Sequence, residues 1–179
     1  MVSAGFVLKT PLLRLCNVLD AANIDLKCFD DGLYRHQCNG SLYPVLHTLE
    51  TLKAEHVWIE ITNLLIPSFN DSATLISKMC HWLATNSFEN VPLHFNRFFP
   101  SYRNQDLQQT PLSTLLRAKE IALDCGLNFV YLGNTNEYNS ENTICPSCRK
   151  LLIIRNGFNI VHNHLQHGPD PCNKVLTSP

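Results

Sequence analysis

The feature that most constrains the fold is the run Val-Trp-Ile-Glu-Ile-Thr-Asn-Leu-Leu-Ile, which spans residues 57–66. The run is rich in β-branched and apolar side chains, and Pro67 follows it directly. Such a composition predicts a strand that is covered on both faces, as strands in parallel sheets usually are. The chain is therefore expected to fold as an α/β protein.

Other segments predict strands and helices that alternate along the chain. Further strands are predicted over residues 2–8, 21–27, 91–98 and 128–132. Helices are predicted over residues 11–18 and 42–55, after a cap at Asp71 or Ser72, and between a cap at Thr110 and Gly126. Repeated strand–helix units imply a parallel sheet with right-handed crossovers. Ligands are then expected at the carboxyl ends of the strands.

Composition and charge narrow the classes of function. A chain of 179 residues forms one domain, or one domain with a small appendage. Its 14 basic and 15 acidic residues nearly balance and form no basic cluster, so we expect no nucleic-acid partner. Apolar runs are too short to span a membrane. Eight cysteines and the lack of a signal-peptide pattern predict a reducing, cytoplasmic location.

Polar residues gather at the ends of the predicted strands. Asp25 and Lys27 lie two residues apart on one strand, so their side chains share a face. A carboxylate and an ammonium held there can bind the amino-acid end of a zwitterionic small molecule. The simpler interpretation is a solvated strand end whose two charges satisfy each other. The other polar residues at predicted strand ends are Thr62, Asn63, His94, Asn96 and Arg97.

The C-terminal part of the chain has a different character. Cys145-Pro146-Ser147-Cys148 is followed by two predicted short strands, 151–155 and 158–161, around Asn156-Gly157, a strong hairpin signal. A Cys-x-x-Cys turn with a hairpin and later Cys or His ligands describes a zinc knuckle. Its ligands would be Cys145, Cys148, Cys172 and a histidine of the tail such as His167; the competing interpretation is an unmetallated remnant.

Several segments together resemble the radical SAM superfamily. They are residues 21–27 (AANIDLK), 57–67 (VWIEITNLLIP), 70–72 (NDS), 92–98 (PLHFNRF) and 141–148 (ENTICPSC). More narrowly, they resemble the radical SAM enzymes of the AmmeMemoRadiSam system, which are relatives of pyruvate formate-lyase-activating enzymes. The resemblance runs from about residue 5 to residue 157. It implies the C-terminal half of a partial (βα)6 barrel over residues 1–135, followed by a zinc-knuckle-like hairpin appendage over residues 136–179.

The resemblance also implies cofactors and a site. Such enzymes hold a [4Fe-4S] cluster and S-adenosylmethionine, and the reduced cluster cleaves the sulfonium to release a 5′-deoxyadenosyl radical. By motif, Asp25 and Lys27 would contact the methionyl part of S-adenosylmethionine. Thr62 would lie on the next strand of the same rim, and His94 would line the same site. A carboxylate suits the ammonium of the ligand, and a lysine suits its carboxylate.

The chain departs from the family pattern in ways that bear on activity. The sequence contains no Cys-x-x-x-Cys-x-x-Cys motif and no glycine-rich second strand, and Cys28 and Ser68 stand where glycines are usual. We therefore expect the chain to be inactive alone. It could be a fragment or incorrect gene model of a complete enzyme, or one half of a barrel completed by a second chain. Alternatively, it could be a non-catalytic binding or scaffold protein that uses the zinc knuckle and the exposed edge of the strand at residues 2–8.

Overall fold

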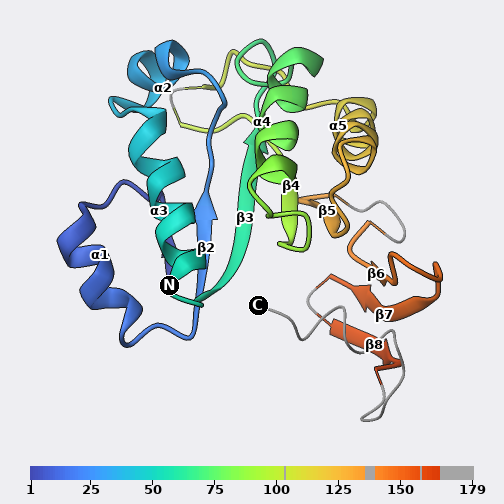
Figure 1. Cartoon of the computed structure of the whole chain (residues 1–179). Helices are drawn as coiled ribbons and strands as arrows, with labels where there is room; N and C mark the ends of the chain where they lie inside the picture. Colours follow the sequence, from blue (N-terminus) through green and yellow to red (C-terminus); the bar gives the residue numbers. More distant parts are fainter. Residues whose placement is uncertain (103, 136–139, 158, 166–179) are drawn as a thin grey trace.

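A parallel five-stranded sheet forms the centre of the protein (Figure 1). The computed structural model describes residues 1–102, 104–135, 140–157 and 159–165. The strands lie side by side in their order along the chain, which requires a crossover between each pair. The strands are β1 (Val2–Ser3), β2 (Ala21–Asp25), β3 (Trp58–Leu65), β4 (Leu93–Arg97) and β5 (Val130–Gly133). The α/β class predicted from the sequence is therefore confirmed.

Helices occupy the connections between the strands. The helices are α1 (Lys9–Cys16), α2 (Asp31–Cys38), α3 (Leu42–Ala54), α4 (Ala73–Thr85) and α5 (Leu112–Asp124). The longer helices α3, α4 and α5 lie on the same side of the sheet in Figure 1 and supply most of the helical side chains in the core. Within the described residues, no helix has the length and apolar composition needed to cross a bilayer.

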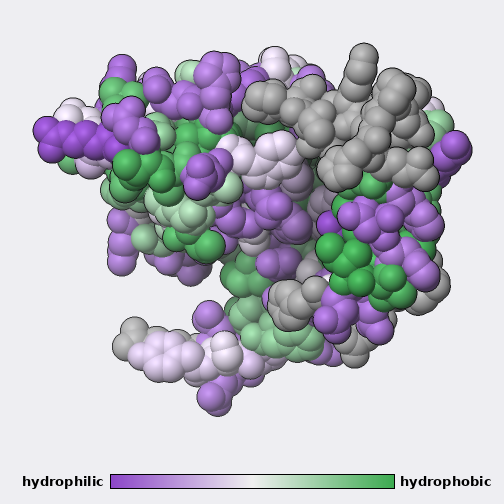
Figure 2. All heavy atoms as spheres, turned by 90° about the horizontal axis from the view of Figure 1, so that it is seen from below, coloured by the Kyte–Doolittle hydropathy of each residue, from purple (hydrophilic) through white to green (hydrophobic). Residues whose placement is uncertain are grey.

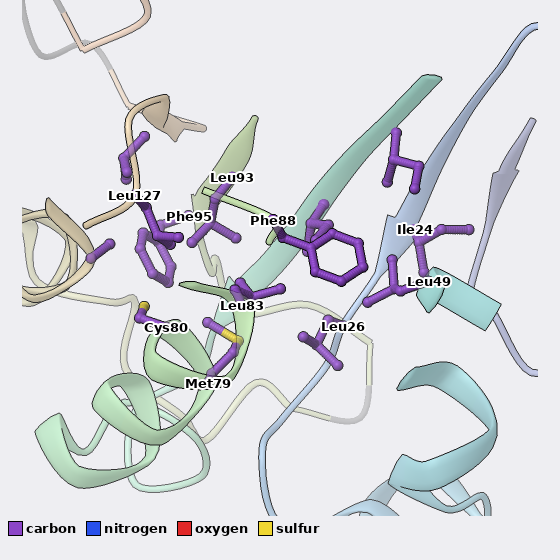
Figure 3. Packing of buried hydrophobic residues seen from close by; sticks show 14 of the residues in the cluster. Ile24, Leu26, Leu49, Met79, Cys80, Leu83, Phe88, Leu93, Phe95 and Leu127 are labelled. Atoms are coloured by element: carbon purple, nitrogen blue, oxygen red, sulfur yellow. The ribbon is translucent and has the colours of Figure 1, made fainter. Parts of the chain in front are cut away.

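The main core lies between the sheet and these helices (Figure 3). The core includes Ile24 and Leu26 of the β2 segment, Leu49 of α3, Leu83 of α4 and Phe95 of β4. All five side chains are at most 1% exposed. Burying such a side chain contributes about 1.5–3 kcal/mol, so this layer accounts for much of the stability of the fold.

The prediction that β3 is covered on both faces is wrong. Burial alternates along the strand: Ile59, Ile61 and Leu65 are buried against the helices, whereas Glu60 and Thr62 are only partly buried. The reason is that the described helices cover one face of the sheet and the side chains of β3 alternate between the two faces. Glu60 and Thr62, two residues apart within the mostly apolar run, both lie on the second face.

The N-terminal strand is shorter than predicted, because β1 ends at Ser3. Gly5 has φ +71°, and a Cβ at this position would lie 2.8 Å from Cγ2 of Ile24. The chain therefore turns away from the sheet at a residue that only glycine fits easily. β1 remains an edge strand, and Val2 and Leu8 are 83% and 80% exposed.

Helix α2 was not predicted from the sequence. The helix is short and mostly polar, so it shows little apolar periodicity. The side chain of Asp30 caps it by accepting a hydrogen bond from the N–H of Leu33 at 2.9 Å. Its last residue is Cys38.

The capping predictions have mixed outcomes. Ser72, rather than Asp71, caps α4 by accepting a hydrogen bond from the N–H of Leu75 at 3.3 Å. The predicted cap at Thr110 is wrong, because Pro111 is the N-cap residue of α5. The hydroxyl of Thr110 instead donates to the carbonyl oxygen of Leu65 at 2.6 Å, which ties this segment to the end of β3. Gly126 follows α5 as predicted and has φ +96°.

A second, antiparallel sheet follows the parallel one. It consists of β6 (Thr143–Ile144), β7 (Leu151–Asn156) and β8 (Asn159–Asn163). Gly157, with φ +58°, joins the last two strands, so the predicted hairpin at Asn156-Gly157 is confirmed. The domain boundary predicted between residues 135 and 136 adjoins residues 136–139, which lie outside the described residues.

Candidate binding site on the polar face of the sheet

The face of the sheet opposite α3, α4 and α5 is lined by polar side chains, and we call it the polar face. Strand register places Asp25 beside Thr62, Thr62 beside His94, and His94 beside Tyr131. These four residues therefore form a row across β2, β3, β4 and β5. The polar face is made up of Asn23, Asp25, Lys27, Glu60, Thr62, His94, Asn96 and Tyr131.

Asp25 and Lys27 form an ion pair at one end of this row. The Nζ atom of Lys27 donates to Oδ2 of Asp25 at 2.7 Å, as the simpler interpretation of the sequence requires. Their side chains are nevertheless 31% and 37% exposed, so a solute can reach both charged groups. The pair is weakly held as well as accessible, because exposed ion pairs are worth roughly 0.2–1 kcal/mol.

Two buried asparagines fix the backbone that carries the pair. Nδ2 of Asn63 donates to the carbonyl oxygen of Leu26 at 2.6 Å, and Nδ2 of Asn70 donates to that of Lys27 at 2.6 Å. Asn63, which the sequence placed with the ligand-facing residues, is 2% exposed and lies on the helix side of the sheet. Its role in the structure is to support the strand end, because its position in β3 alternates with that of Thr62.

Tyr34 of α2 also contacts this segment. Its hydroxyl accepts a hydrogen bond from the N–H of Lys27 at 3.2 Å. Burial raises the pKa of Tyr34 to about 12, so the hydroxyl stays neutral at ordinary pH. The unpredicted helix α2 therefore helps to position the charged pair.

His94 and Glu60 form a second polar pair on the same face. Nε2 of His94 lies 3.4 Å from Oε2 of Glu60, within ion-pair range but without the geometry of a hydrogen bond. This imidazole nitrogen is buried and has no hydrogen-bond partner among the described residues. The interaction with His94 lowers the pKa of Glu60 and outweighs the opposing effect of burial.

A chain of contacts links His94 to the antiparallel sheet. The His94 ring stacks on Tyr131, with 5.1 Å between centroids and 23° between planes. The Tyr131 hydroxyl lies 3.0 Å from Oγ1 of Thr143 in β6. Nη1 of Arg155 in β7 donates to the same Oγ1 at 2.8 Å. The side chains of the polar face are therefore connected to the C-terminal hairpin.

The sequence interpretation missed three residues of this face: Asn23, Glu60 and Tyr131. Thr62 donates to Oδ1 of Asn23 at 2.9 Å, and it lies in the middle of β3 instead of at its end. The available signal was the spacing of two residues that relates Asn23 to Asp25 and Glu60 to Thr62. These residues were missed because only polar residues at the ends of the predicted strands were considered as site residues.

Residues Cys145 to Arg149 form a tight turn. The N–H of Arg149 donates to the carbonyl oxygen of Cys145 at 2.9 Å, and Arg149 has φ +62°. Cys145 is buried and Cys148 is exposed. The other two predicted zinc ligands, His167 and Cys172, lie outside the described residues. Across residues 1–102, 104–135, 140–157 and 159–165, no three His, Cys, Asp or Glu side chains lie close enough together to hold a metal ion.

No protein-family profile matches the chain. It is 40% identical over 159 residues to the uncharacterized protein MJ0808 of Methanocaldococcus jannaschii, a match that covers 89% of this chain and 47% of the relative. The chain thus spans about half the length of that curated relative.

Two solved structures share the fold. A domain of pyruvate-formate lyase-activating enzyme from Bacteroides vulgatus ATCC 8482 matches with TM-score 0.60 and 18% identity, over 74% of this chain and 79% of that one. A radical SAM methyltransferase from Sphaerobacter thermophilus matches with TM-score 0.61 and 13% identity, over 84% of this chain and 43% of that one. The chain therefore has a radical SAM-like fold, as the sequence resemblance implied.

Proposed function

We propose that the polar face binds the amino-acid end of S-adenosylmethionine. In this proposal Asp25 receives the ammonium group of the ligand and Lys27 receives its carboxylate, while Thr62 and His94 border the same site. The observation that supports it best is the accessible Asp25–Lys27 pair, in register with Thr62 and His94 on a radical SAM-like sheet.

The internal ion pair is a small energetic obstacle to a zwitterionic ligand. Breaking the partly exposed pair costs roughly 0.2–1 kcal/mol. A zwitterionic ligand then offers each group a new partner, its ammonium for Asp25 and its carboxylate for Lys27. Because Asn63 and Asn70 hold the backbone at Leu26 and Lys27, the two charged groups stay in place when their partners change.

The residues present do not fit a [4Fe-4S] cluster. The sequence has no Cys-x-x-x-Cys-x-x-Cys motif, and the described residues contain no cluster of metal-ligating side chains. The proposal for this chain is therefore limited to binding of S-adenosylmethionine. In our proposal, cluster ligands for radical chemistry come from outside these 179 residues, through a longer polypeptide or a second chain that completes the barrel.

Calorimetric titration with S-adenosylmethionine tests the proposal. Asp25→Asn and Lys27→Gln should each weaken binding about tenfold or more, which corresponds to roughly 1.4 kcal/mol. Free methionine, which shares the zwitterion, should compete. Arg35→Gln is the matched control because Arg35 forms an ion pair of the same length, 2.7 Å, with Asp31 on the surface. Equal effects of Lys27→Gln and Arg35→Gln, or no binding by the wild type, would refute the proposal.

A structural zinc site in the appendage is a second candidate function. The backbone geometry of the Cys145–Cys148 turn supports it, and thiolates are the usual ligands of structural zinc. Metal analysis of the purified protein should find zinc, and Cys145→Ser or Cys148→Ser should abolish it. The control is Cys38→Ser at the end of α2. Zinc retention by both knuckle variants would contradict this candidate.

The non-catalytic alternative makes a separate prediction. A binding or scaffold protein would use the knuckle and the edge of β1, where Val2 is 83% exposed. Such a protein would bind no S-adenosylmethionine in the titration, and any interaction with its partner would be lost in Cys145→Ser or in a Val2→Lys variant.

A further inference from the structure

A small cavity lies at the outer edge of β5, remote from the Asp25–Lys27 pair along the sheet. Side chains and backbone from α5, the β5 segment and the knuckle line it. Its volume is about 70 Å³, whereas one water molecule needs roughly 10–15 Å³ of such space. The cavity can therefore hold a group of several atoms. We call it the β5-edge cavity, and its lining includes Lys119, Asn128, Val130, Tyr131 and Arg149.

Two positive side chains meet at this cavity without an acidic partner. Lys119 of α5 is partly buried, and Arg149 follows the Cys145–Cys148 turn. Among the described residues, neither Lys119 nor Arg149 forms an ion pair with a carboxylate. Burial lowers the pKa of Lys119, and the nearby Arg149 charge lowers it further. An anion between Lys119 and Arg149 would offset the repulsion between their two positive charges.

A backbone donor is directed to the same edge. The N–H of Leu132 donates outward from β5 to the carbonyl oxygen of Ser140 at 3.2 Å. Because N–H groups of alternate residues point to the same edge of a strand, the N–H of Val130 is directed to the outer edge too. An anion in the β5-edge cavity would therefore meet an ammonium, a guanidinium and a peptide N–H. These are the groups that proteins use to bind oxyanions.

We propose that the β5-edge cavity binds a tetrahedral oxyanion, either inorganic phosphate or the phosphate group of a larger molecule. The guanidinium of Arg149 supplies a planar fork of donors and Lys119 supplies a point charge. Because Lys119 lies on α5 and Arg149 lies beside the knuckle, the bound anion bridges the parallel sheet layer and the C-terminal appendage.

Phosphate titration followed by 31P NMR, with sodium chloride holding the ionic strength constant, measures this binding on the full chain. Lys119→Gln and Arg149→Gln should each weaken phosphate binding about tenfold or more. Two matched controls should bind like the wild type. Arg117→Gln removes a positive charge from the same helix as Lys119, and Lys150→Gln removes one next to Arg149.

Thermal unfolding of the same variants gives a second readout. Phosphate should raise the unfolding midpoint of the wild type and of both controls, but not that of Lys119→Gln or Arg149→Gln. Phenyl phosphate distinguishes the sources: tighter binding than inorganic phosphate indicates a phosphomonoester, and weaker binding indicates the free ion. No binding by the wild type, or equal losses in all four variants, would overturn the proposal. Because Arg149 is exposed, its variant keeps the test valid even when Lys119→Gln fails to fold.

Discussion

Replacing Asn70 with alanine would test how one buried side chain supports the charged pair of the polar face. Asn70 is 3% exposed and forms three hydrogen bonds. Its Oδ1 accepts from the N–H of Ile66 at 2.7 Å, and its Nδ2 donates to the carbonyl oxygens of Lys27 at 2.6 Å and Leu64 at 2.8 Å. The side chain thus joins the loop after β3 to Lys27, two residues past the end of β2.

The three hydrogen bonds of Asn70 set the expected loss of stability. At about 1 kcal/mol for each hydrogen bond, Asn70→Ala should lower the free energy of unfolding by roughly 3 kcal/mol. For a chain of this size, each kcal/mol lowers the unfolding midpoint by about 2–4 °C, so a decrease of roughly 6–12 °C is expected. Loss of the contact with Lys27 should also weaken S-adenosylmethionine binding at temperatures where the variant is still folded.

Urea denaturation with two spectroscopic probes measures the stability change, and titration calorimetry measures binding. Asn90→Ala is the control, because Asn90 is exposed and its single side-chain hydrogen bond, to Asn128, lies on the surface. That control should change stability by less than about 0.5 kcal/mol. A loss below about 1 kcal/mol for Asn70→Ala would refute the reasoning, because the three backbone groups would then have found other partners.

Three further predictions concern the core, the polar face and a helix end. Phe95→Ala removes a fully buried ring and should cost about 3–5 kcal/mol in urea denaturation. The pKa of Glu60 lies below its ordinary value of 4.5, so the charged carboxylate stabilises the fold above that value, and this stabilisation is lost as the pH falls through the lower folded pKa. Between pH 6 and pH 3 the wild type should therefore lose more stability than Glu60→Gln. Gly126→Ala should cost about 1 kcal/mol in thermal unfolding because φ is +96° there; a neutral change would show that this helix end relaxes freely.

The parallel sheet was predictable because its signals are local. The apolar run before Pro67 forms β3, and the predicted strand that ends at Lys27 forms β2; both strands are somewhat shorter than predicted. The predicted hairpin at Asn156-Gly157 was also confirmed, because that dipeptide favours the positive φ that the turn needs. Helix α2 was missed because its stability depends on tertiary contacts such as that of Tyr34 with Lys27.

The candidate site was only partly accessible to sequence reasoning. The motif gave Asp25, Lys27, Thr62 and His94, and strand register aligns three of these in one row. Which face a residue occupies depends on where the helices pack, and that is a non-local property. Asn63 was therefore placed with the wrong group, and Tyr131 was overlooked although it stacks on His94.

The stacked and hydrogen-bonded series from His94 through Tyr131 and Thr143 to Arg155 has a thermodynamic consequence. Tyr131 belongs to the polar face and also lines the β5-edge cavity. A solute that orders the His94 ring and an anion that fixes the hairpin would therefore act on one shared aromatic residue. By thermodynamic linkage, if the anion changes the affinity for the solute by some factor, the solute changes the affinity for the anion by the same factor. Hydrogen exchange at the amides of β7 would then change when a solute binds to the polar face at His94.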